Sequence, residues 1–219
     1  GKGIQQIRNQ GACGSCWAFS TVAAVFDSLV HIGKSPVNLS EQYLVDCHEE
    51  SYGCGGGYFT AFDAMVDPLG SPSLASYPYY ARNGYCKRKP FVETLVDWKY
   101  LGKPKIGPPA AEIQRALMEF GGVSVDVSAS GPFGGYKSGI YNGCYRGSIN
   151  HMVNIVGWNN EGAVANSDGV YPPGKGYWIM RNSWGKNWGE SGYMRIRYTD
   201  TKGNKCNRIG WTAAVAIVK

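Results

Sequence analysis

The hydrophobic pattern of residues 16–32 (CWAFSTVAAVFDSLVHI) predicts a helix that ends at Gly33. Residues 17–26 carry no charged side chain, and Asp27 is the first acidic residue of the segment. A helix that is apolar on all its faces is buried on most of them. The pattern therefore predicts a central helix, with Cys16 in its first turn.

Two shorter helices are predicted to follow. Residues 41–47 (EQYLVDC) come directly after Ser40, a residue type that satisfies free N–H groups at a helix start. Residues 59–67 (FTAFDAMVD) stop at Pro68, which disfavours the helical conformation of the residue before it. Between the two predicted helices lies a glycine-rich loop, residues 48–58 (HEESYGCGGGY).

After residue 100 the pattern changes from helical to strand-like. Residues 102–109 (GKPKIGPP) are predicted to be a linker, and residues 110–120 (AAEIQRALMEF) a helix. Five short strand patterns come next, separated by Gly, Asn and Asp turns: VSVDV (123–127), HMVNIVGW (151–158), GYWIMRNSW (176–184), GYMRIRY (192–198) and TAAVAIV (212–218). Helices early and strands late indicate an α+β protein of two lobes, which we place at residues 1–106 and 107–219.

The composition is that of a globular protein, with 43% hydrophobic and 17% charged residues among 219. No apolar stretch has the ~18 residues of a membrane span, and residues 1–10 lack the apolar core of a signal peptide, as expected of a processed, mature chain. The net charge of +6 comes from scattered lysines and arginines, so we expect no nucleic-acid partner. Three histidines are too few for a set of metal ligands, and we expect neither a metal nor a cofactor.

The seven cysteines are more informative than the charge. Proteins of oxidising compartments use cysteines as disulfides, whereas cytosolic proteins keep thiols reduced. Three disulfides leave one cysteine over, which is either bonded to another molecule or a reactive thiol. The count favours a secreted, periplasmic or lysosomal/vacuolar protein, and leaves the roughly fifteen pairings of six cysteines open.

Cys16 stands where a thiol would be reactive. Only the thiolate is a good nucleophile, and a free cysteine with a pKa near 8.5 is mostly protonated at neutral pH. The unpaired N–H groups and the dipole of a helix start favour the thiolate by ~1 kcal/mol. A stable ion pair also needs an imidazolium, which must come from elsewhere in the chain.

Of the three histidines, His151 is the best candidate for this partner. His31 is predicted at the far end of the same helix, ~22 Å from Cys16. His48 lies in an acidic loop, where we expect it to face solvent. His151 directly precedes an apolar strand pattern. By elimination, Cys16 is the predicted nucleophile and His151 its base.

Five segments resemble the papain/cathepsin family of cysteine peptidases. They are QGACGSCWAFS (10–20), LSEQYLVDC (39–47), YGCGGGY (52–58), NHMVNIVGW (150–158) and RNSWGKNWGESGYMRIR (181–197), in the family's order and with near-family spacing. The resemblance implies a papain-like fold, in which a helical lobe around a central helix faces a β-barrel-like lobe across the active-site cleft. It also implies a cathepsin L-like endopeptidase, because the paired histidines of the dipeptide-removing branch are missing between Cys54 and Cys86.

The resemblance assigns a role to each residue of the reaction. Cys16 would be the nucleophile and His151 its acid–base partner, working through a thiolate–imidazolium pair and an acyl-enzyme. Asn182 would orient the imidazole, and Trp184 would shield their hydrogen bond from water. The side chain of Gln10 and the backbone N–H of Cys16 would form the oxyanion hole.

The resemblance also implies a substrate cleft. Gly56 and Gly57 match the strip that pairs with an extended substrate, where a side chain would prevent close approach. The pocket for the side chain two places before the cleaved bond would be formed by Tyr58, Phe59, Asp126, Ile149, Asn150, Met152 and Trp211. Met152 and Trp211 are larger than usual there, so we expect a shallow pocket that prefers Val or Leu to Phe.

Asp126 offers a competing expectation for this pocket, because a carboxylate in the cavity would favour Lys or Arg. The alternation of VSVDV, however, places Asp126 and Ser124 on the face opposite the valines. We expect that face to point towards solvent or the cleft rim.

The family pattern pairs Cys13 with Cys54, Cys47 with Cys86 and Cys144 with Cys206, and leaves Cys16 free. Each bridge would close a loop of about 40–60 residues, where chain-entropy estimates reach ~4 kcal/mol. Two further features depart from the family. The Asp-Trp-Arg-like opening of mature members is missing, and the polar loop 159–176 makes the chain between the histidine and the asparagine longer than in the plant enzymes.

Two other function classes remain as alternatives. A dithiol oxidoreductase would use Cys13 and Cys16 as a reversible pair, but no strand pattern precedes them. An inactive binding protein on the papain fold would be expected to lack the nucleophile or the histidine, and this chain has both. As an enzyme, the protein would act on polypeptide substrates, bind its own propeptide and protein inhibitors, and act as a monomer.

Overall fold

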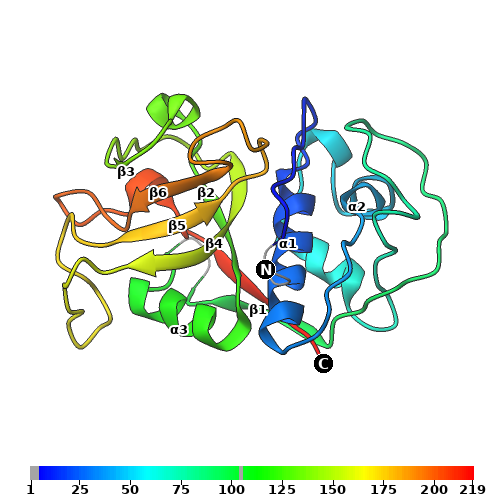
Figure 1. The fold of residues 1–219 in the computed structure, drawn as a ribbon, viewed down its shortest axis with the longest axis horizontal. Helices are drawn as coiled ribbons and strands as arrows, with labels where there is room; N and C mark the ends of the chain where they lie inside the picture. The colour runs from blue at the N-terminus through cyan, green and yellow to red at the C-terminus, as the bar shows by residue number, and fades with distance from the viewer. Residues whose placement is uncertain (1–4, 104–105) are drawn as a thin grey trace.

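The computed structural model describes residues 5–103 and 106–219. In these residues the α-helices are α1 (Cys16–His31), α2 (Glu41–Cys47) and α3 (Ala110–Phe120). The strands are β1 (Asp97–Leu101), β2 (Val123–Val127), β3 (Ile140–Tyr141), β4 (His151–Asn159), β5 (Tyr177–Arg181), β6 (Tyr193–Arg197) and β7 (Ala213–Ile217). The 3₁₀-helices are η1 (Gly53–Gly55), η2 (Phe59–Met65), η3 (Gly131–Gly135) and η4 (Cys206–Arg208). Helices α1 and α2 lie towards one side of the molecule, and α3 lies with most of the sheet on the other (Figure 1).

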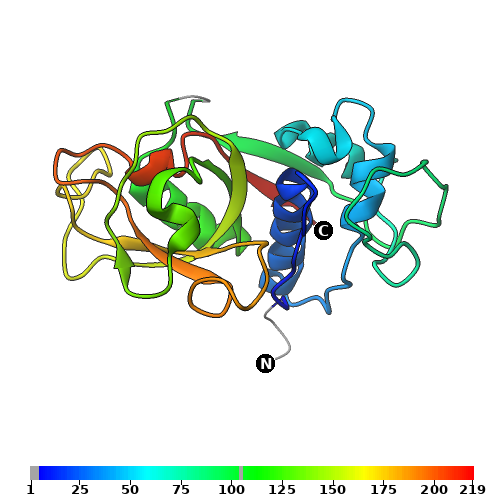
Figure 2. The same cartoon turned by 90° about the horizontal axis from the view of Figure 1, so that it is seen from above.

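Helix α1 is the predicted central helix. Every residue from Trp17 to Phe26 is buried. The helix ends at His31 with Ile32 as its cap, and the predicted terminator Gly33 follows with a φ of +81°, which suits glycine better than any other residue. Seen from above, α1 stands at the boundary between the helical side and the sheet (Figure 2). Its apolar faces are therefore covered from both sides.

The two short predicted helices have different outcomes. For α2 the prediction is confirmed, since Ser40 Oγ accepts a hydrogen bond of 2.9 Å from the backbone N–H of Tyr43. Residues 59–65 form the 3₁₀-helix η2 instead of the expected longer helix. In a 3₁₀-helix, side chains three residues apart lie on one face, and Phe59, Phe62 and Met65 are all buried. The spacing of these three apolar side chains is the physical reason for the tighter helix.

The seven strands of the described residues form one sheet in the order β1-β7-β2-β4-β5-β6-β3. The five predicted strands are present, and so is the helix before them, α3. Strands β1 and β3 were not predicted: β1 exposes most of its side chains, and β3 has two residues. The described part of the predicted linker has no regular structure between β1 and α3, and residues 104–105 lie outside the described residues.

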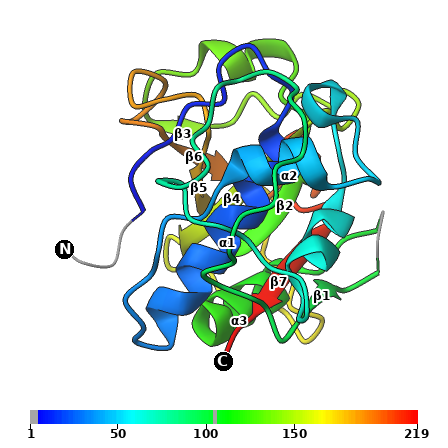
Figure 3. The ribbon, with the colours of Figure 1, turned by 90° about the vertical axis from the view of Figure 1, so that its right-hand side faces the viewer.

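Buried side chains form two cores that meet at α1 and β7. One core is built around α1, α2 and η2, and the other lies between α3 and the sheet. Strand β7 serves both, because Ala214 and Ala216 face the first core while Ala213 and Val215 face the second. Figure 3 shows β7 and β1 passing close to α1. No helix of the described residues is long and apolar enough to cross a membrane.

Polar contacts also join the two cores. Arg181 at the end of β5 forms a buried ion pair of 2.7 Å with Asp27 of α1. Ser20 of α1 lies 2.7 Å from the hydroxyl of Ser124 in β2. The expectation that Ser124 faces solvent or the cleft rim is therefore wrong, because α1 covers that face of the strand and Ser124 is fully buried.

Candidate active site

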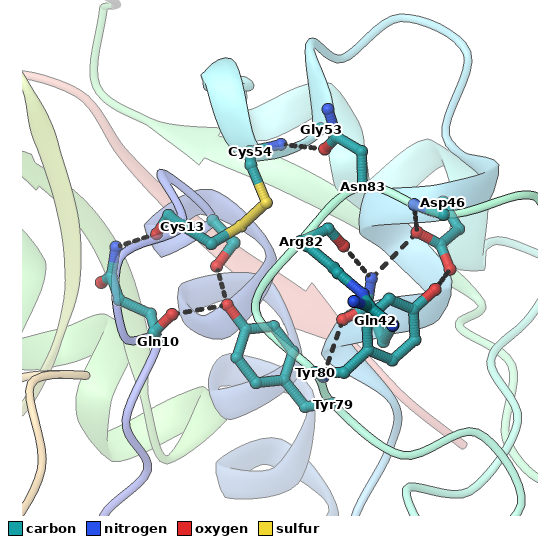
Figure 4. The surroundings of a disulfide bond; sticks show 12 residues. Gln10, Cys13, Gln42, Asp46, Gly53, Cys54, Tyr79, Tyr80, Arg82 and Asn83 are labelled. Carbon is teal, nitrogen blue, oxygen red and sulfur yellow. Dashed lines mark hydrogen bonds between the residues drawn. A yellow bond between two sulfur atoms is a disulfide. The ribbon is translucent and has the colours of Figure 1, made fainter.

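Cys16 is the free cysteine of this chain, and the other six form three disulfides. The bonded pairs are Cys13–Cys54, Cys47–Cys86 and Cys144–Cys206, the pairs that the family pattern implies. Because Cys13 is bonded to Cys54, the alternative of a reversible pair between Cys13 and Cys16 is wrong. The Cys13–Cys54 bridge ties the segment before α1 to the glycine-rich loop (Figure 4).

The backbone at Gly14 reinforces this connection. Its N–H donates a hydrogen bond of 2.9 Å to the carbonyl of Cys54, and a Cβ added at Gly14 would lie 2.5 Å from that oxygen. Only glycine allows the two segments to approach so closely. The start of α1, and with it Cys16, is therefore held against one wall of the cleft.

His151 is the first residue of β4, and Asn182 follows directly after β5. The two strands are antiparallel neighbours, so residues 31 positions apart in the chain meet at one end of the sheet. His151 Nε2 lies 2.8 Å from Asn182 Oδ1. The ring of Trp184 stacks on the imidazole at 4.8 Å between centroids. Nδ1 is then the imidazole nitrogen left for another partner.

Cys16 and His151 stand at the starts of α1 and β4, two elements that pack against each other. The backbone N–H groups of Met152, the next residue along β4, of Trp17 and of Cys16 itself lower the pKa of the thiol. Cys16 and His151 also line the same cavity. The N–H groups of Cys16 and Trp17 belong to the first turn of α1, where free N–H groups stabilise an anion, whereas that of Met152 comes from β4.

Burial disfavours a charge on the Cys16 thiol or on the His151 imidazole when the other group is neutral. Desolvation raises the pKa of the Cys16 thiol, although the backbone hydrogen bonds to the sulfur oppose that shift. Desolvation lowers the pKa of His151 to about 4, against the opposing effect of the Asn182 hydrogen bond. A thiolate alone or an imidazolium alone is thus unfavourable here. Proton transfer from thiol to imidazole avoids this cost, because the two charges that it creates attract each other.

Gln10 reaches the cleft because the N-terminal segment pairs with the chain after β5. Its backbone N–H donates to the Ser183 carbonyl at 2.8 Å, and its Oε1 accepts from Ser183 Oγ at 2.7 Å. Its Nε2 donates to the carbonyl of Cys13 at 2.9 Å. Nε2 carries two hydrogens, so a second N–H remains for a ligand in the cavity that Gln10 lines.

The cavity between the two cores has a volume of about 810 Å³. Its predicted lining residues are Gln10, Cys16, Gly56, Gly57, Tyr58, Phe59, Asp126, Ile149, Asn150, His151, Met152 and Trp184. Asn182 is not in this lining but behind His151. Trp211 is not in the lining either, and packs beneath the guanidinium of Arg208.

Several lining residues were not found from the sequence, namely Gly14, Tyr52, Gly55, Tyr100, Ala129 and Thr212. Thr212 occupies the place that we expected for Trp211. The two are neighbours in the bend directly before β7, and Thr212 lines the cavity whereas Trp211 does not. Tyr100 was missed because β1 was not predicted. Tyr52 is the first residue of the segment YGCGGGY (52–58) and could have been found from that motif.

The two glycines of the predicted substrate strip differ in what surrounds them. A Cβ at Gly57 would lie 2.4 Å from the ring of Trp17, so packing against α1 already requires glycine there. Gly56 has open space around it and a φ of +129°, a conformation that other residues rarely adopt. The structure thus gives each glycine a reason that is independent of substrate approach.

Asp126 is buried and lines the cleft, so the expectation that it faces solvent is wrong. Its side chain accepts a hydrogen bond of 2.7 Å from the backbone N–H of Thr212. Its residue is 6% exposed and lines the cavity. Desolvation raises the pKa of this carboxyl to about 6, with the hydrogen bonds from Thr212 opposing the shift. The carboxyl is therefore neutral in mildly acidic solution.

His48 also differs from expectation. Its residue is half-buried rather than solvent-facing, and its ring lies 5.9 Å from that of Trp17. Burial lowers its pKa, so the ring is neutral at neutral pH. The reason is that the Cys47–Cys86 bridge and η1 fold the acidic loop back onto α1. His48 is not in the lining of the cleft.

Comparison with known proteins gives consistent results. The chain matches the family described as papain family cysteine protease over residues 1–216. It is 38% identical to zingipain-2 of Zingiber officinale, covering 93% of this chain and 87% of that protein. It is 35% identical to cathepsin K of Mus musculus, covering 93% of this chain and 58% of that protein. The solved structure of the bromelain protease from Ananas comosus with the E64 inhibitor superposes with a TM-score of 0.81 at 33% identity, covering 99% of this chain and 95% of that chain.

Proposed function

Because the chain belongs to the papain family of cysteine proteases, we propose that it cleaves peptide bonds with Cys16 as nucleophile and His151 as acid–base partner. The observation that carries this assignment is the position of the one free thiol. Cys16 lies at the start of α1, the backbone N–H of Met152 lowers the pKa of its thiol, and it shares a cavity with His151. An imidazole held through Nε2 by Asn182 presents Nδ1 as its free nitrogen.

In the first half of the reaction, the proton of the Cys16 thiol moves to His151, and the thiolate attacks the substrate carbonyl carbon. The C–S bond forms while the carbonyl π bond becomes an oxyanion, which the Gln10 side chain and the Cys16 N–H stabilise. The imidazolium then gives its proton to the leaving amine as the C–N bond breaks. The acyl group remains on Cys16 as a thioester.

In the second half, His151 takes a proton from a water molecule, whose oxygen attacks the thioester. The resulting oxyanion collapses, the C–S bond breaks, and the carboxylic acid leaves. Asn182 keeps the imidazole aligned for both proton transfers. As a neutral amide it adds no negative charge that would compete with the thiolate for the imidazolium. The stacked ring of Trp184 keeps water from this hydrogen bond.

Substrate selection would rest on the wall formed by Tyr58, Phe59, Ile149 and Met152. These side chains are apolar or aromatic, and Met152 of β4 is 7% exposed within the lining. Medium apolar groups such as Val or Leu are the best fit. Asp126, neutral below about pH 6, does not oppose this preference in acid.

The remaining expectations complete the proposal. Residues 1–106 and 107–219 act as the two lobes that border the cleft, and the chain works as a monomer. It is the mature form of a zymogen and binds its own propeptide and protein inhibitors. The solved structure of a relative in its pro-form, the digestive procathepsin L2 of Tenebrio molitor, supports the zymogen. Three disulfides favour a secreted, periplasmic or lysosomal/vacuolar location.

Labelling and hydrolysis together test the assignment. Iodoacetamide should label the unreduced protein at Cys16 alone, as read by peptide mass mapping. The Cys16→Ser variant should fold but show no hydrolysis of a peptide substrate with Leu two places before the cleaved bond. Retained peptidase activity in Cys16→Ser, or a label on another cysteine, would contradict the proposal.

A further inference from the structure

We infer that Tyr79 is a positioning residue of the oxyanion hole, because its hydroxyl holds Gln10 and the residue before Cys16 in one fixed arrangement. The inference rests on the proposed function, in which Gln10 and the backbone N–H of Cys16 are the two oxyanion donors. These donors belong to separate segments of chain. Their relative position must therefore be set by contacts between the segments.

The Tyr79 hydroxyl makes one contact to each segment. It donates a hydrogen bond of 2.7 Å to the backbone carbonyl of Gln10, and it lies 2.7 Å from Ser15 Oγ (Figure 4 shows the first contact). A carbonyl oxygen has no hydrogen to give, so the single proton of Tyr79 goes to Gln10. Ser15 must then donate to Tyr79. The directions of both hydrogen bonds follow from this chemistry.

Ser15 behaves unusually for its position. It stands at the N-cap of α1, where a serine side chain normally accepts a hydrogen bond from the first turn. Here the side chain caps no N–H group of α1, and its residue is completely buried. Its hydroxyl is committed to Tyr79 instead. Ser15, the residue before the nucleophile, thus bonds to a residue 64 positions away instead of capping its own helix.

Tyr79 itself is firmly held. Its ring packs edge-on against Phe19 of α1, with centroids 4.8 Å apart. The next residue, Tyr80, donates its backbone N–H to Gln42 of α2 and its hydroxyl to Asp46. Burial raises the pKa of Tyr79, so the hydroxyl keeps its proton at any pH at which the enzyme would work. Tyr79 can therefore serve as a rigid bridge.

The other contacts of the Gln10 side chain do not hold the backbone carbonyl of this residue. Ser183 and the Cys13 carbonyl hold the amide end of the side chain. The peptide after Gln10 leads into Gly11, which has a φ of +62° and gives the chain freedom to move. Tyr79 fixes the carbonyl of that peptide. Without the Tyr79 hydroxyl, we expect the position of the Gln10 side chain relative to the Cys16 N–H to vary more.

Tyr79→Phe removes the hydroxyl and keeps the ring against Phe19. We expect kcat to fall roughly 5- to 30-fold, less than the roughly 10²–10³-fold loss typical of deleting an oxyanion donor, with KM changed less than about twofold. Tyr80→Phe is the matched control, since its hydroxyl serves Asp46 and no residue of the site. It should keep the parent kcat. Equal kcat in Tyr79→Phe and the parent would overturn the inference.

Two reactions of Cys16 separate positioning from general loosening. A peptide aldehyde adds the thiol to its carbonyl and forms a tetrahedral oxygen in the oxyanion hole, whereas alkylation by iodoacetamide forms none. Tyr79→Phe should weaken binding of the aldehyde by roughly the same factor as kcat and leave the alkylation rate unchanged. A loss of aldehyde affinity and of alkylation rate by the same factor would show that the hydroxyl supports the whole site, contrary to the inference.

The double variant Gln10→Ala/Tyr79→Phe tests whether Tyr79 acts through Gln10. After Gln10→Ala, removing the hydroxyl should cost kcat less than about twofold. If Gln10→Ala alone leaves kcat unchanged, the proposed oxyanion hole fails. If Gln10→Ala lowers kcat but Tyr79→Phe does not, or if the two losses multiply in the double variant, only the role of Tyr79 fails.

Discussion

His151 Nε2 lies 2.8 Å from Asn182 Oδ1, and the indole of Trp184 stacks on the same imidazole. Asn182 Oδ1 also accepts the backbone N–H of Ser183 at 2.8 Å, so the amide oxygen is held from two sides. An imidazole with one nitrogen bound to a fixed acceptor has one tautomer and one orientation when neutral. The role of Asn182 in orienting the imidazole can therefore be tested separately from the acid–base role of His151.

Asn182→Ala should lower kcat at least about tenfold while changing KM less, because the imidazole loses alignment and the cleft loses no contact area. His151→Ala removes the acid–base group itself and should lower kcat by about 10²–10⁴. Steady-state kinetics on one peptide substrate compare the two variants. Equal, mild losses in both would contradict the assigned roles.

The thiolate at Cys16 should depend on His151. In the parent we expect alkylation by iodoacetamide to stay fast well below pH 7, because thiolate and imidazolium form together. In His151→Ala the effect of burial, which raises the pKa of the thiol, outweighs that of the backbone N–H groups, so alkylation should become slow and rise only above the free-thiol range near 8.5. The pH dependence of the alkylation rate measures this. Overlapping profiles for parent and variant would rule out the ion pair.

Met152→Ala should widen the pocket for the side chain two places before the cleaved bond. The parent should prefer Val or Leu to Phe, since a misfit of one methylene in such a pocket is worth about 1–3 kcal/mol. In the variant, kcat/KM for the Phe peptide should rise relative to the Leu peptide. Met118→Ala, on the exposed side of α3, is the control for the substitution itself. A parent that already favours Phe would show that Met152 does not fill the pocket.

Asp126 should make this specificity depend on pH. Its raised pKa of about 6 means that the carboxyl is neutral below that pH and negatively charged above it. The ratio of kcat/KM for an Arg peptide to that for a Leu peptide should therefore rise severalfold between pH 5 and pH 7, values that bracket this pKa. Asp126→Asn, which keeps the shape without the charge, should give a flat ratio. A rise of the same size in the asparagine variant would exclude Asp126 as its source.

Stability should fall as pH rises through the titration of Glu41. Its carboxyl is buried, pairs with Arg8 at 3.1 Å, and has a pKa raised by burial to about 7. The folded protein thus holds this proton more tightly than the unfolded chain. The stabilisation is complete below about pH 4.5 and is lost as pH rises to about 7, by up to about 3 kcal/mol.

Urea denaturation from pH 4.5 to 7.5 measures this slope. Cys16→Ser is the suitable background, because it prevents self-digestion, and Glu41→Gln in that background should flatten the slope. If the free energy of unfolding falls equally in both proteins, other groups are responsible.

Features that depend on neighbouring residues in the chain could be predicted from the sequence. The uncharged run from Trp17 to Phe26 identified α1, because a helix that carries no charge on any face is buried on most of its faces. Ser40 identified the start of α2 because a cap acts within one turn. The odd cysteine count required one thiol that no internal bridge can take up, and the helix start after it marked Cys16 as the candidate.

Features that depend on what covers a surface were decided by the tertiary structure. Alternation in β2 showed that Ser124 and Asp126 share a face, but whether that face meets water depends on α1 and the start of β7, which pack over it. Trp211 and Thr212 are neighbours in the chain, and only the path of the bend before β7 decides which one lines the cleft.

The bridge through Tyr79 has the same origin. Nothing near Ser15 in the chain indicates that its hydroxyl turns away from its own helix, since the partner is 64 residues away. A sequence pattern reports the preferences of adjacent residues, whereas a buried hydrogen bond between distant segments forms only when the packing of both cores brings its two atoms together.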